Sequence, residues 1–369
     1  MTIAPTSTFP LRFELTPSKD ARDEAEREVI LADPGFGKHF TDHMVAIDWT
    51  LDGGWHDATV IPYGPLLLDP AASVLHYAQE IFEGLKAYRH EDGSVHTFRP
   101  EKNAERLQRS ARRLALPELS TEDFIESLKQ LIAADGSWVP SGGETSLYLR
   151  PFMIANESFL GVRSAQKVGY YVIASPAGAY FPGGVTPVSI WLSTDYARAG
   201  RGGTGAAKTG GNYASSLLPQ EEAYSNGCAQ VLFLDSSEGT YLEELGGMNV
   251  FLVKKDGTLI TPLSPSILDG VTRDSIIELA KARGHAVEHR RVRFDEWRDG
   301  VASGDIVEVF ACGTAAVVTP IAALKGDGFV IGDPDAQAGE LTMSLRKELT
   351  DIQYGRIPDV NGWLTRLDA

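Results

Sequence analysis

The sequence predicts an α+β protein of two domains. Short strands separated by turns alternate with amphipathic helices along the chain, and the Gly/Pro-rich stretch "SPAGAYFPGGV" (Ser175–Val185) interrupts this pattern near the middle. The length of 369 residues is enough for about two or three domains. We therefore expect a smaller first domain at 1–176, a linker at 177–188 and a larger second domain at 189–369.

The first domain begins with a polar lead-in at residues 1–30, and a short helix is expected within "DEAEREVILADP" (Asp23–Pro34). The segment "EKNAERLQRSARRLAL" (Glu101–Leu116) predicts an amphipathic helix, with Ala104, Leu107, Ala111 and Leu114 on one stripe. A second helix, "TEDFIESLKQLIAAD", is expected to use Thr121 as its N-cap. Strands are predicted at "HMVAIDWT", "SVHTFRP", "TSLYLRPFMIA" and "VGYYVIASPA".

The second domain is predicted to alternate strands with helices. Thr272 is a candidate N-cap for the helix "DSIIELAKARG", and Gly284 is its expected stop. A later helix is expected at "MSLRKELTDIQYG". The predicted strands are "VSIWLST", "AQVLFLDS", "NVFLVKK" and "DIVEVFACG".

Composition excludes several classes of function. The net charge of −16 argues against a nucleic-acid or anionic-membrane partner, because both attract basic surfaces. The N-terminus lacks an apolar signal segment, and no apolar run reaches the ~18 residues of a membrane span. The two cysteines form no disulfide framework, and "HFTDH" (His39–His43) lacks the glutamate of a zinc-protease motif. A soluble, cytoplasmic protein without a bound metal is expected.

Lys208 stands among glycines in "GAAKTGGNYASS" (Gly205–Ser216), and three interpretations compete. It is a solvated loop charge, the lysine of a nucleotide-binding P-loop, or an amine that forms a Schiff base. The P-loop interpretation is weak, because Ala207 replaces the required glycine and Gly210-Gly211 is expected to break the helix that should follow. A Schiff-base lysine needs an amine that loses its proton easily.

Pyridoxal phosphate requires an acid at its ring nitrogen and a cup of N–H groups for its phosphate, besides the lysine. Glu244, in "EELGGMN" (Glu243–Asn249), is a candidate for the acid. The expected helix start at Val271–Thr272 and the small-residue turn of "FACGTAAVVTP" (Phe310–Pro320) are candidates for the anion-binding turns. Each fragment is weak alone, and their conjunction favours the Schiff-base interpretation.

Several segments in this order resemble the branched-chain amino-acid aminotransferases, which are fold-type IV pyridoxal-phosphate enzymes. The resemblance extends from about Phe36 to the C-terminus. It rests on "FGKHFTDHM", "LHYAQEIFEGLKAY", "FRPEKNAERL", "LYLRPFMIANE", "KTGGNY", "EELGGMN", "LDGVTR" and "GTAAVV". It implies a homodimer whose subunits have a small N-terminal α/β domain and a larger pseudo-barrel domain.

The resemblance also implies a role for each matching residue. Lys208 would form the Schiff base, and Glu244 would face the ring nitrogen. The remaining cofactor ligands would be Arg106, Tyr213, Val271, Thr272, Gly313 and Thr314. The substrate pocket would be formed by Phe36, Tyr77, Phe82, Tyr148, Arg150, Tyr180, Thr314 and Ala315, with Leu160 and Val162 on a loop that reaches the partner subunit's site.

The implied reaction is a ping-pong transamination. The amino group of L-leucine, L-isoleucine or L-valine would pass to 2-oxoglutarate through a Lys208 Schiff base with pyridoxal phosphate, giving glutamate and a branched 2-oxo acid, as the last step of branched-chain amino-acid biosynthesis. D-Amino-acid aminotransferase and aminodeoxychorismate lyase, from the same fold type, are the alternatives. A P-loop phosphotransferase and a non-catalytic binding module are the alternatives from other classes.

Overall fold

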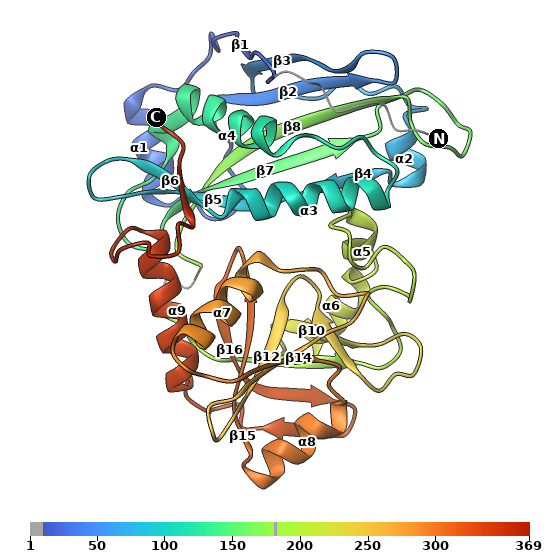
Figure 1. The fold of residues 1–369 in the computed structure, drawn as a ribbon, viewed down its shortest axis with the longest axis vertical. Helices are drawn as coiled ribbons and strands as arrows, with labels where there is room; N and C mark the ends of the chain where they lie inside the picture. Colours follow the sequence, from blue (N-terminus) through green and yellow to red (C-terminus); the bar gives the residue numbers. More distant parts are fainter. Residues whose placement is uncertain (1–9, 181–182) are drawn as a thin grey trace. The chain divides into compact units, whose positions relative to one another are not determined.

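The structure is a computed structural model of the chain, and it describes residues 10–180 and 183–369. The chain forms two compact units, which are described separately (Figure 1). The first comprises Met1–Tyr180, Ala207–Gly210 and Ile352–Ala369, and the second comprises Phe181–Ala206 and Gly211–Asp351. Part of the predicted lead-in (1–9) and part of the predicted linker (181–182) lie outside the described residues.

The first unit is built on a mixed sheet. The spatial order is β1 (Glu14–Leu15), β3 (Gly54–Pro62), β2 (His43–Thr50), β8 (Lys167–Ala177), β7 (Ser146–Ile154), β5 (Leu85–Arg89), β6 (Val95–Phe98) and β18 (Leu364–Arg366), with β4 (Glu80–Phe82) paired to β7. All of these pairs except β1–β3 are antiparallel.

Helices α3 (Pro100–Arg113) and α4 (Thr121–Asp135) pack against each other, and α4 also contacts β2, β3 and β8 (Figure 1). Three residues of the predicted stripe of α3, Ala104, Leu107 and Ala111, are buried in the core of this unit, whereas the fourth, Leu114, follows the end of the helix and is half-buried. The predicted N-cap of α4 is wrong by one residue. The side chain of Ser120, not Thr121, accepts the hydrogen bond from the backbone N–H of Asp123.

Two shorter helices complete the first unit. Helix α1 (Glu24–Ala32) lies within the segment predicted to be helical, and Asp23 and Glu26 form a capping box at its start. Helix α2 (Ser73–Tyr77) ends at Ala78, which has a left-handed backbone conformation. A single 3-10 turn, η1 (Gly136–Trp138), follows α4.

The second unit contains another mixed sheet, whose inward side chains form a separate apolar core. Its order is β11 (Leu242–Leu245), β10 (Gln230–Leu234), β9 (Val188–Ser193), β16 (Val317–Gly326), β15 (Ile306–Gly313), β12 (Asn249–Lys254), β13 (Leu259–Pro262) and β14 (Val287–Arg290), with β17 (Phe329–Gly332) paired to β16. Its helices are most of α5 (Gly210–Ala214), α6 (Leu217–Ser225), α7 (Val271–Ala282), α8 (Phe294–Ser303) and most of α9 (Glu340–Gln353).

Two helix starts in this unit differ from the sequence predictions. Helix α7 begins at Val271 with Gly270 as its N-cap, so the prediction that Thr272 caps it is wrong. Gly284 follows the helix with a positive φ of 84°, as expected of a stop. Gly210 and Gly211 were expected to break a helix after Lys208. This expectation is wrong, because helix α5 begins at Gly210. Within the described residues, no helix is both long and apolar enough to span a membrane.

Candidate active site

The backbone around Lys208 is fixed by strand β4 and helix α3 of the first unit. The Phe82 N–H donates to the Lys208 carbonyl at 3.0 Å, and the Lys208 N–H donates to Ser110 Oγ at 2.9 Å. The carboxylate of Glu80 accepts a hydrogen bond from the Gly210 N–H. Contacts on both sides of the lysine therefore hold its backbone in one position.

The amine of Lys208 lies over an aromatic ring, with Nζ 4.6 Å from the ring centroid of Phe82. Burial, together with the charges of Arg106 and Arg150, lowers the pKa of Lys208 to about 8, and the carboxylate of Glu83 partly opposes this shift. An amine with this pKa has a larger deprotonated fraction near neutral pH than an ordinary lysine, and the deprotonated form is the one that attacks a carbonyl carbon. The interpretation of Lys208 as a solvated loop charge is thus not supported.

Arg106 and Glu83 form a bidentate ion pair beside this amine. Nε of Arg106 donates to Glu83 Oε1 at 2.8 Å, and Nη2 donates to Oε2 at 2.7 Å. Asn103, one turn earlier on α3, donates to the same Oε2 at 2.8 Å. Arg106 is 4% exposed and Glu83 is completely buried. The sequence motifs pointed to Arg106 but not to Glu83, although "IFEG" lies within one of them.

Four of the predicted substrate-pocket residues lie together in the first unit. The rings of Phe36 and Tyr148 meet edge to face at 5.1 Å, and Arg150 Nη2 donates to the Tyr148 hydroxyl at 3.1 Å. The Arg150 guanidinium lies 4.9 Å from the ring centroid of Phe82. A Cβ atom at Gly84 would lie 2.0 Å from the Tyr148 hydroxyl oxygen, so this cluster requires glycine at that position.

The other predicted pocket residues of this unit are exposed. The Tyr77 hydroxyl donates to the carbonyl oxygen of Leu160, which orders the loop that carries Leu160 and Val162. Tyr180 is the last residue of the first chain segment of this unit. Substrate contacts by these four residues stay a prediction.

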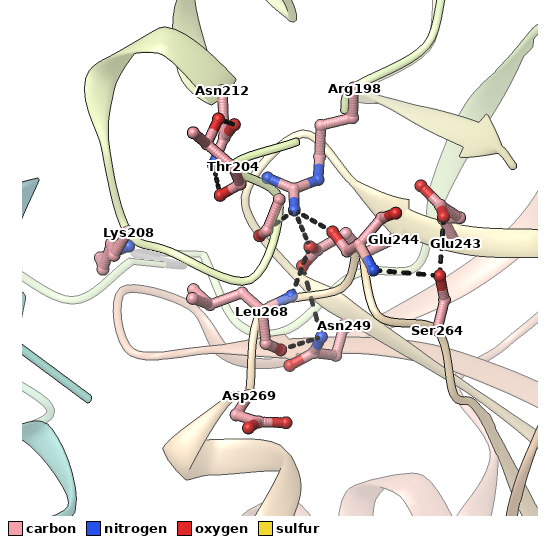
Figure 2. Close-up of polar contacts among 12 residues, drawn as sticks. Arg198, Thr204, Lys208, Asn212, Glu243, Glu244, Asn249, Ser264, Leu268 and Asp269 are labelled. Atoms are coloured by element: carbon pink, nitrogen blue, oxygen red, sulfur yellow. Dashed lines mark hydrogen bonds and ion pairs between the residues drawn. The ribbon is translucent and has the colours of Figure 1, made fainter. Parts of the chain in front are cut away.

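Glu244 of β11 lies in a buried polar cluster of the second unit (Figure 2). Its Oε1 is 2.5 Å from Arg198 Nη2 and accepts the Leu268 N–H at 2.8 Å. Its Oε2 accepts from Asn249 Nδ2 at 3.3 Å. Arg198 also donates to two backbone carbonyls. No sequence pattern pointed to Arg198, which lies far from Glu244 along the chain in a stretch without a recognised motif.

The neighbouring Glu243 has a different environment. Ser264 Oγ donates to its Oε1 at 2.9 Å, and burial raises the pKa of this carboxyl group. Among the described residues, the carboxylate of Glu244 therefore lies within ion-pair distance of an arginine, and that of Glu243 does not. The two side chains point to different surroundings because successive residues of a strand face opposite sides.

Helix α7 presents its N-terminus beside the Glu244 cluster. A Cβ atom at Gly270 would lie 2.0 Å from Asn249 Oδ1, so any side chain at the N-cap position would displace the Asn249 side chain. Gly270 has no side chain to cap the helix, which leaves the N–H groups of Val271 and Thr272 in the uncapped first turn. An uncapped helix N-terminus attracts an anion such as phosphate.

The turn between β15 and β16 lies next to the loop that follows Glu244. A Cβ at Gly313 would lie 3.2 Å from Met248 Cγ, and a Cβ at Gly247 would lie 3.6 Å from the Tyr213 ring. Thr314 and Ala315 complete this turn. It ends at Val317, a buried β-branched residue with a φ of 61°, which is a strained conformation often found near functional sites. Within the second unit, the structure thus brings Tyr213, Glu244, Val271 and Gly313 into one region.

The described residues fit the demands of pyridoxal phosphate. They provide an amine of lowered pKa at Lys208, a buried carboxylate at Glu244 and an uncapped helix start at Val271. This set of donors and acceptors matches the aldehyde, ring nitrogen and phosphate of that cofactor.

Comparison with known proteins defines the class. The family description "Amino-transferase class IV" matches residues 80–324. The chain belongs to the class IV aminotransferases. This membership, the fold type and the family resemblance predicted from the motifs are confirmed.

Branched-chain-amino-acid aminotransferases are among the relatives within this class. The enzyme of that name from Mycolicibacterium smegmatis is 59% identical over 364 residues, covering 97% of this chain and 99% of the relative. The structure of the Escherichia coli branched-chain amino acid aminotransferase superposes with a TM-score of 0.73 at 28% identity, covering 88% of this chain and 99% of that chain. The branched-chain amino acid aminotransferase from Thermobaculum terrenum, in its PLP-form, gives a TM-score of 0.72 at 25% identity, covering 88% of this chain and 98% of that chain.

Proposed function

We propose that this chain transfers the amino group of L-leucine, L-isoleucine or L-valine to 2-oxoglutarate, and catalyses the reverse reaction, with pyridoxal phosphate as cofactor. The environment of Lys208 carries this proposal, because its amine has a pKa of about 8 and its backbone is held on both sides. The high identity to a branched-chain-amino-acid aminotransferase supports the choice of substrates. The proposed setting is a homodimer in the cytoplasm, at the last step of branched-chain amino-acid biosynthesis.

In this proposal Lys208 carries the cofactor and acts as the general base and acid. When bound, pyridoxal phosphate supplies a ring that takes up the negative charge left when a proton leaves the substrate Cα. The amine of Lys208 removes that proton in one direction and returns it in the other. A pKa near the working pH suits both roles, because neither protonation state is strongly preferred.

The other cofactor ligands have separate proposed roles. Glu244 is the partner of the ring nitrogen, and its contacts with Arg198 and Leu268 fix the carboxylate in place. The Tyr213 hydroxyl group donates a hydrogen bond to the phenolic oxygen of the cofactor. The phosphate is held by Arg106, Val271, Thr272 and Thr314, and the turn at Gly313–Ala315 also holds the substrate α-carboxylate.

The cluster of Phe36, Phe82, Tyr148 and Arg150 explains how one pocket accepts both substrate types. Burial of a branched aliphatic side chain against the rings contributes about 1.5–3 kcal/mol. A glutamate side chain would be costly to bury without a partner for its carboxylate. The Arg150 guanidinium, which lies against the rings of Phe82 and Tyr148, supplies that partner. The same residues serve the two substrates in turn, as a ping-pong sequence requires.

An amino-transfer assay tests the proposal. Purified protein supplied with pyridoxal phosphate, L-leucine and 2-oxoglutarate is expected to form glutamate and the branched 2-oxo acid in equal amounts. D-Leucine in place of L-leucine is the matched control and is expected to give neither product. Preference for D-amino acids, or lyase activity without amino transfer, would favour one of the two alternative fold-type IV enzymes and contradict the proposal.

A further inference from the structure

Glu83 is a buried carboxylate next to Lys208 that the proposed reaction does not use. It follows β4 and precedes β5 in the chain, and its side chain is completely buried. Both of its oxygens accept hydrogen bonds from Arg106, at 2.8 and 2.7 Å, and Asn103 donates to one of them. Two contacts to one guanidinium fix the plane of that group as well as its position.

The need for a stable core does not explain this pair. Removing two charges from water is costly, and well-packed apolar residues often replace a buried ion pair with no loss of stability. Buried pairs of this kind therefore call for another explanation. The position of Glu83 beside a reactive amine provides one, because a fixed charge close to an amine changes how tightly it holds its proton.

The charged groups around Lys208 include two cations and one opposing carboxylate. Arg106 and Arg150 are cations that act on its amine, Tyr148 is a weak acid of the same cluster, and Glu83 is the carboxylate that opposes the two arginines. Glu80 lies on the same strand, but its carboxylate accepts from Gly210 and Thr209 in the segment after the lysine. Without Glu83, the amine would face two cations.

We propose that Glu83 is a positioning residue that fixes the guanidinium of Arg106 beside the amine of Lys208 and offsets its charge. This inference rests on the proposed function, since it assumes that Lys208 is the reactive amine. It predicts that the charges of Glu83 and Arg106 have opposite effects on the protonation of Lys208. A carboxylate that served only to fill the core would have no such relation to Arg106.

The test is a pH titration of the visible absorbance of the protein loaded with pyridoxal phosphate. Glu83→Gln removes the anion, and the pH at the midpoint of the absorbance change is expected to fall by about one unit. Arg106→Gln removes the cation and is expected to raise the midpoint. The double variant Glu83→Gln/Arg106→Gln removes both charges and is expected to return close to the wild-type midpoint. Glu83→Asp keeps the charge and is expected to restore most of the shift caused by Glu83→Gln.

The matched control is Glu105→Gln on the same helix as Arg106. Glu105 forms a surface ion pair with Lys102, and its side chain is 44% exposed, so its replacement is expected to leave the midpoint unchanged. If a single variant does not fold, the double variant, which leaves no unpaired buried charge, still tests the inference through its expected return close to the wild-type midpoint.

The possible outcomes separate this inference from the proposed function. If Glu83→Gln and the control have the same midpoint while borohydride fixes the cofactor to Lys208, the inference is overturned and the proposed function stands. A midpoint that rises in Glu83→Gln also overturns it. If the loaded wild-type protein shows no visible band, or the cofactor is fixed elsewhere, the proposed function fails and the inference fails with it.

Discussion

The amine of Lys208 is expected to reduce the stability of the folded chain, so Lys208→Met should stabilise the cofactor-free protein. Burial and the charge of Arg106 lower the pKa of Lys208 from 10.5 to about 8. This difference of about 2.5 pH units corresponds to about 3 kcal/mol, at about 1.4 kcal/mol for each unit. Lys208 is half-buried, so solvent screening makes this an upper value.

The pH dependence follows from proton binding in the two states. Between about pH 8 and 10.5 the unfolded chain holds the Lys208 proton and the folded chain has released it. The contribution of Lys208 to the free energy of unfolding therefore rises with pH across that window. Below about pH 8 the charged amine of Lys208 destabilises the folded chain by the full amount. Methionine does not titrate. The gain in the free energy of unfolding from Lys208→Met is therefore largest at pH 7, and the part of it that comes from the charged amine is lost near pH 10.5.

Urea unfolding of the cofactor-free protein at pH 7, 9 and 10.5, followed by circular dichroism, measures this gain. Lys38→Met, at an exposed lysine, is the matched control, and its effect is subtracted at each pH. The same Lys208→Met variant is expected to have no amino-transfer activity. A stability gain that does not change between pH 7 and 10.5 would refute the account of a buried amine with a lowered pKa.

Three further substitutions test the site by steady-state kinetics, and urea unfolding also measures the stability of the second. Arg150→Ala is expected to lower kcat/KM for glutamate about 10- to 100-fold, because a charged hydrogen bond of about 1.5–3 kcal/mol is lost, and to lower it much less for leucine; equal losses would remove its proposed role. Gly84→Ala places a methyl group 2.0 Å from the Tyr148 hydroxyl, so it is expected to cost about 1–3 kcal/mol of stability and to alter substrate selection. Gly64→Ala, where no atom lies within 4 Å, is its control and should change neither property. Glu244→Gln is expected to reduce kcat about 10- to 100-fold for all substrates, and a loss confined to one substrate would contradict its role toward the cofactor.

Local sequence patterns predicted the secondary structure well where one principle dominated. The apolar stripe of α3 and the stop at Gly284 are of this kind. The prediction failed at Gly210, because glycine propensity argued against a helix there. The carboxylate of Glu80 holds the Gly210 N–H, and this tertiary contact outweighs the weak intrinsic preference of the residue.

The motifs identified the family and the candidate site residues, but not their surroundings. The motif "EELGGMN" predicts Glu244 as the acid, whereas the pairing of Glu244 with Arg198 depends on the fold of the whole second unit. The pairing of β18 with β6 is likewise non-local, and no local pattern indicates that Ile352–Ala369 belongs to the first unit. Contacts between residues far apart in the chain require the structure, because a single sequence records no spatial proximity.

The central claim is that Lys208 carries pyridoxal phosphate, and reductive trapping tests it most directly. The loaded protein is treated with borohydride, digested and analysed by mass spectrometry, with the buried Lys86 as the internal comparison. We expect the phosphopyridoxyl group on the peptide that contains Lys208 and nowhere else, and its loss when L-leucine is added before the reductant. A label on Lys86 or on another lysine, or the absence of any label, would contradict the account.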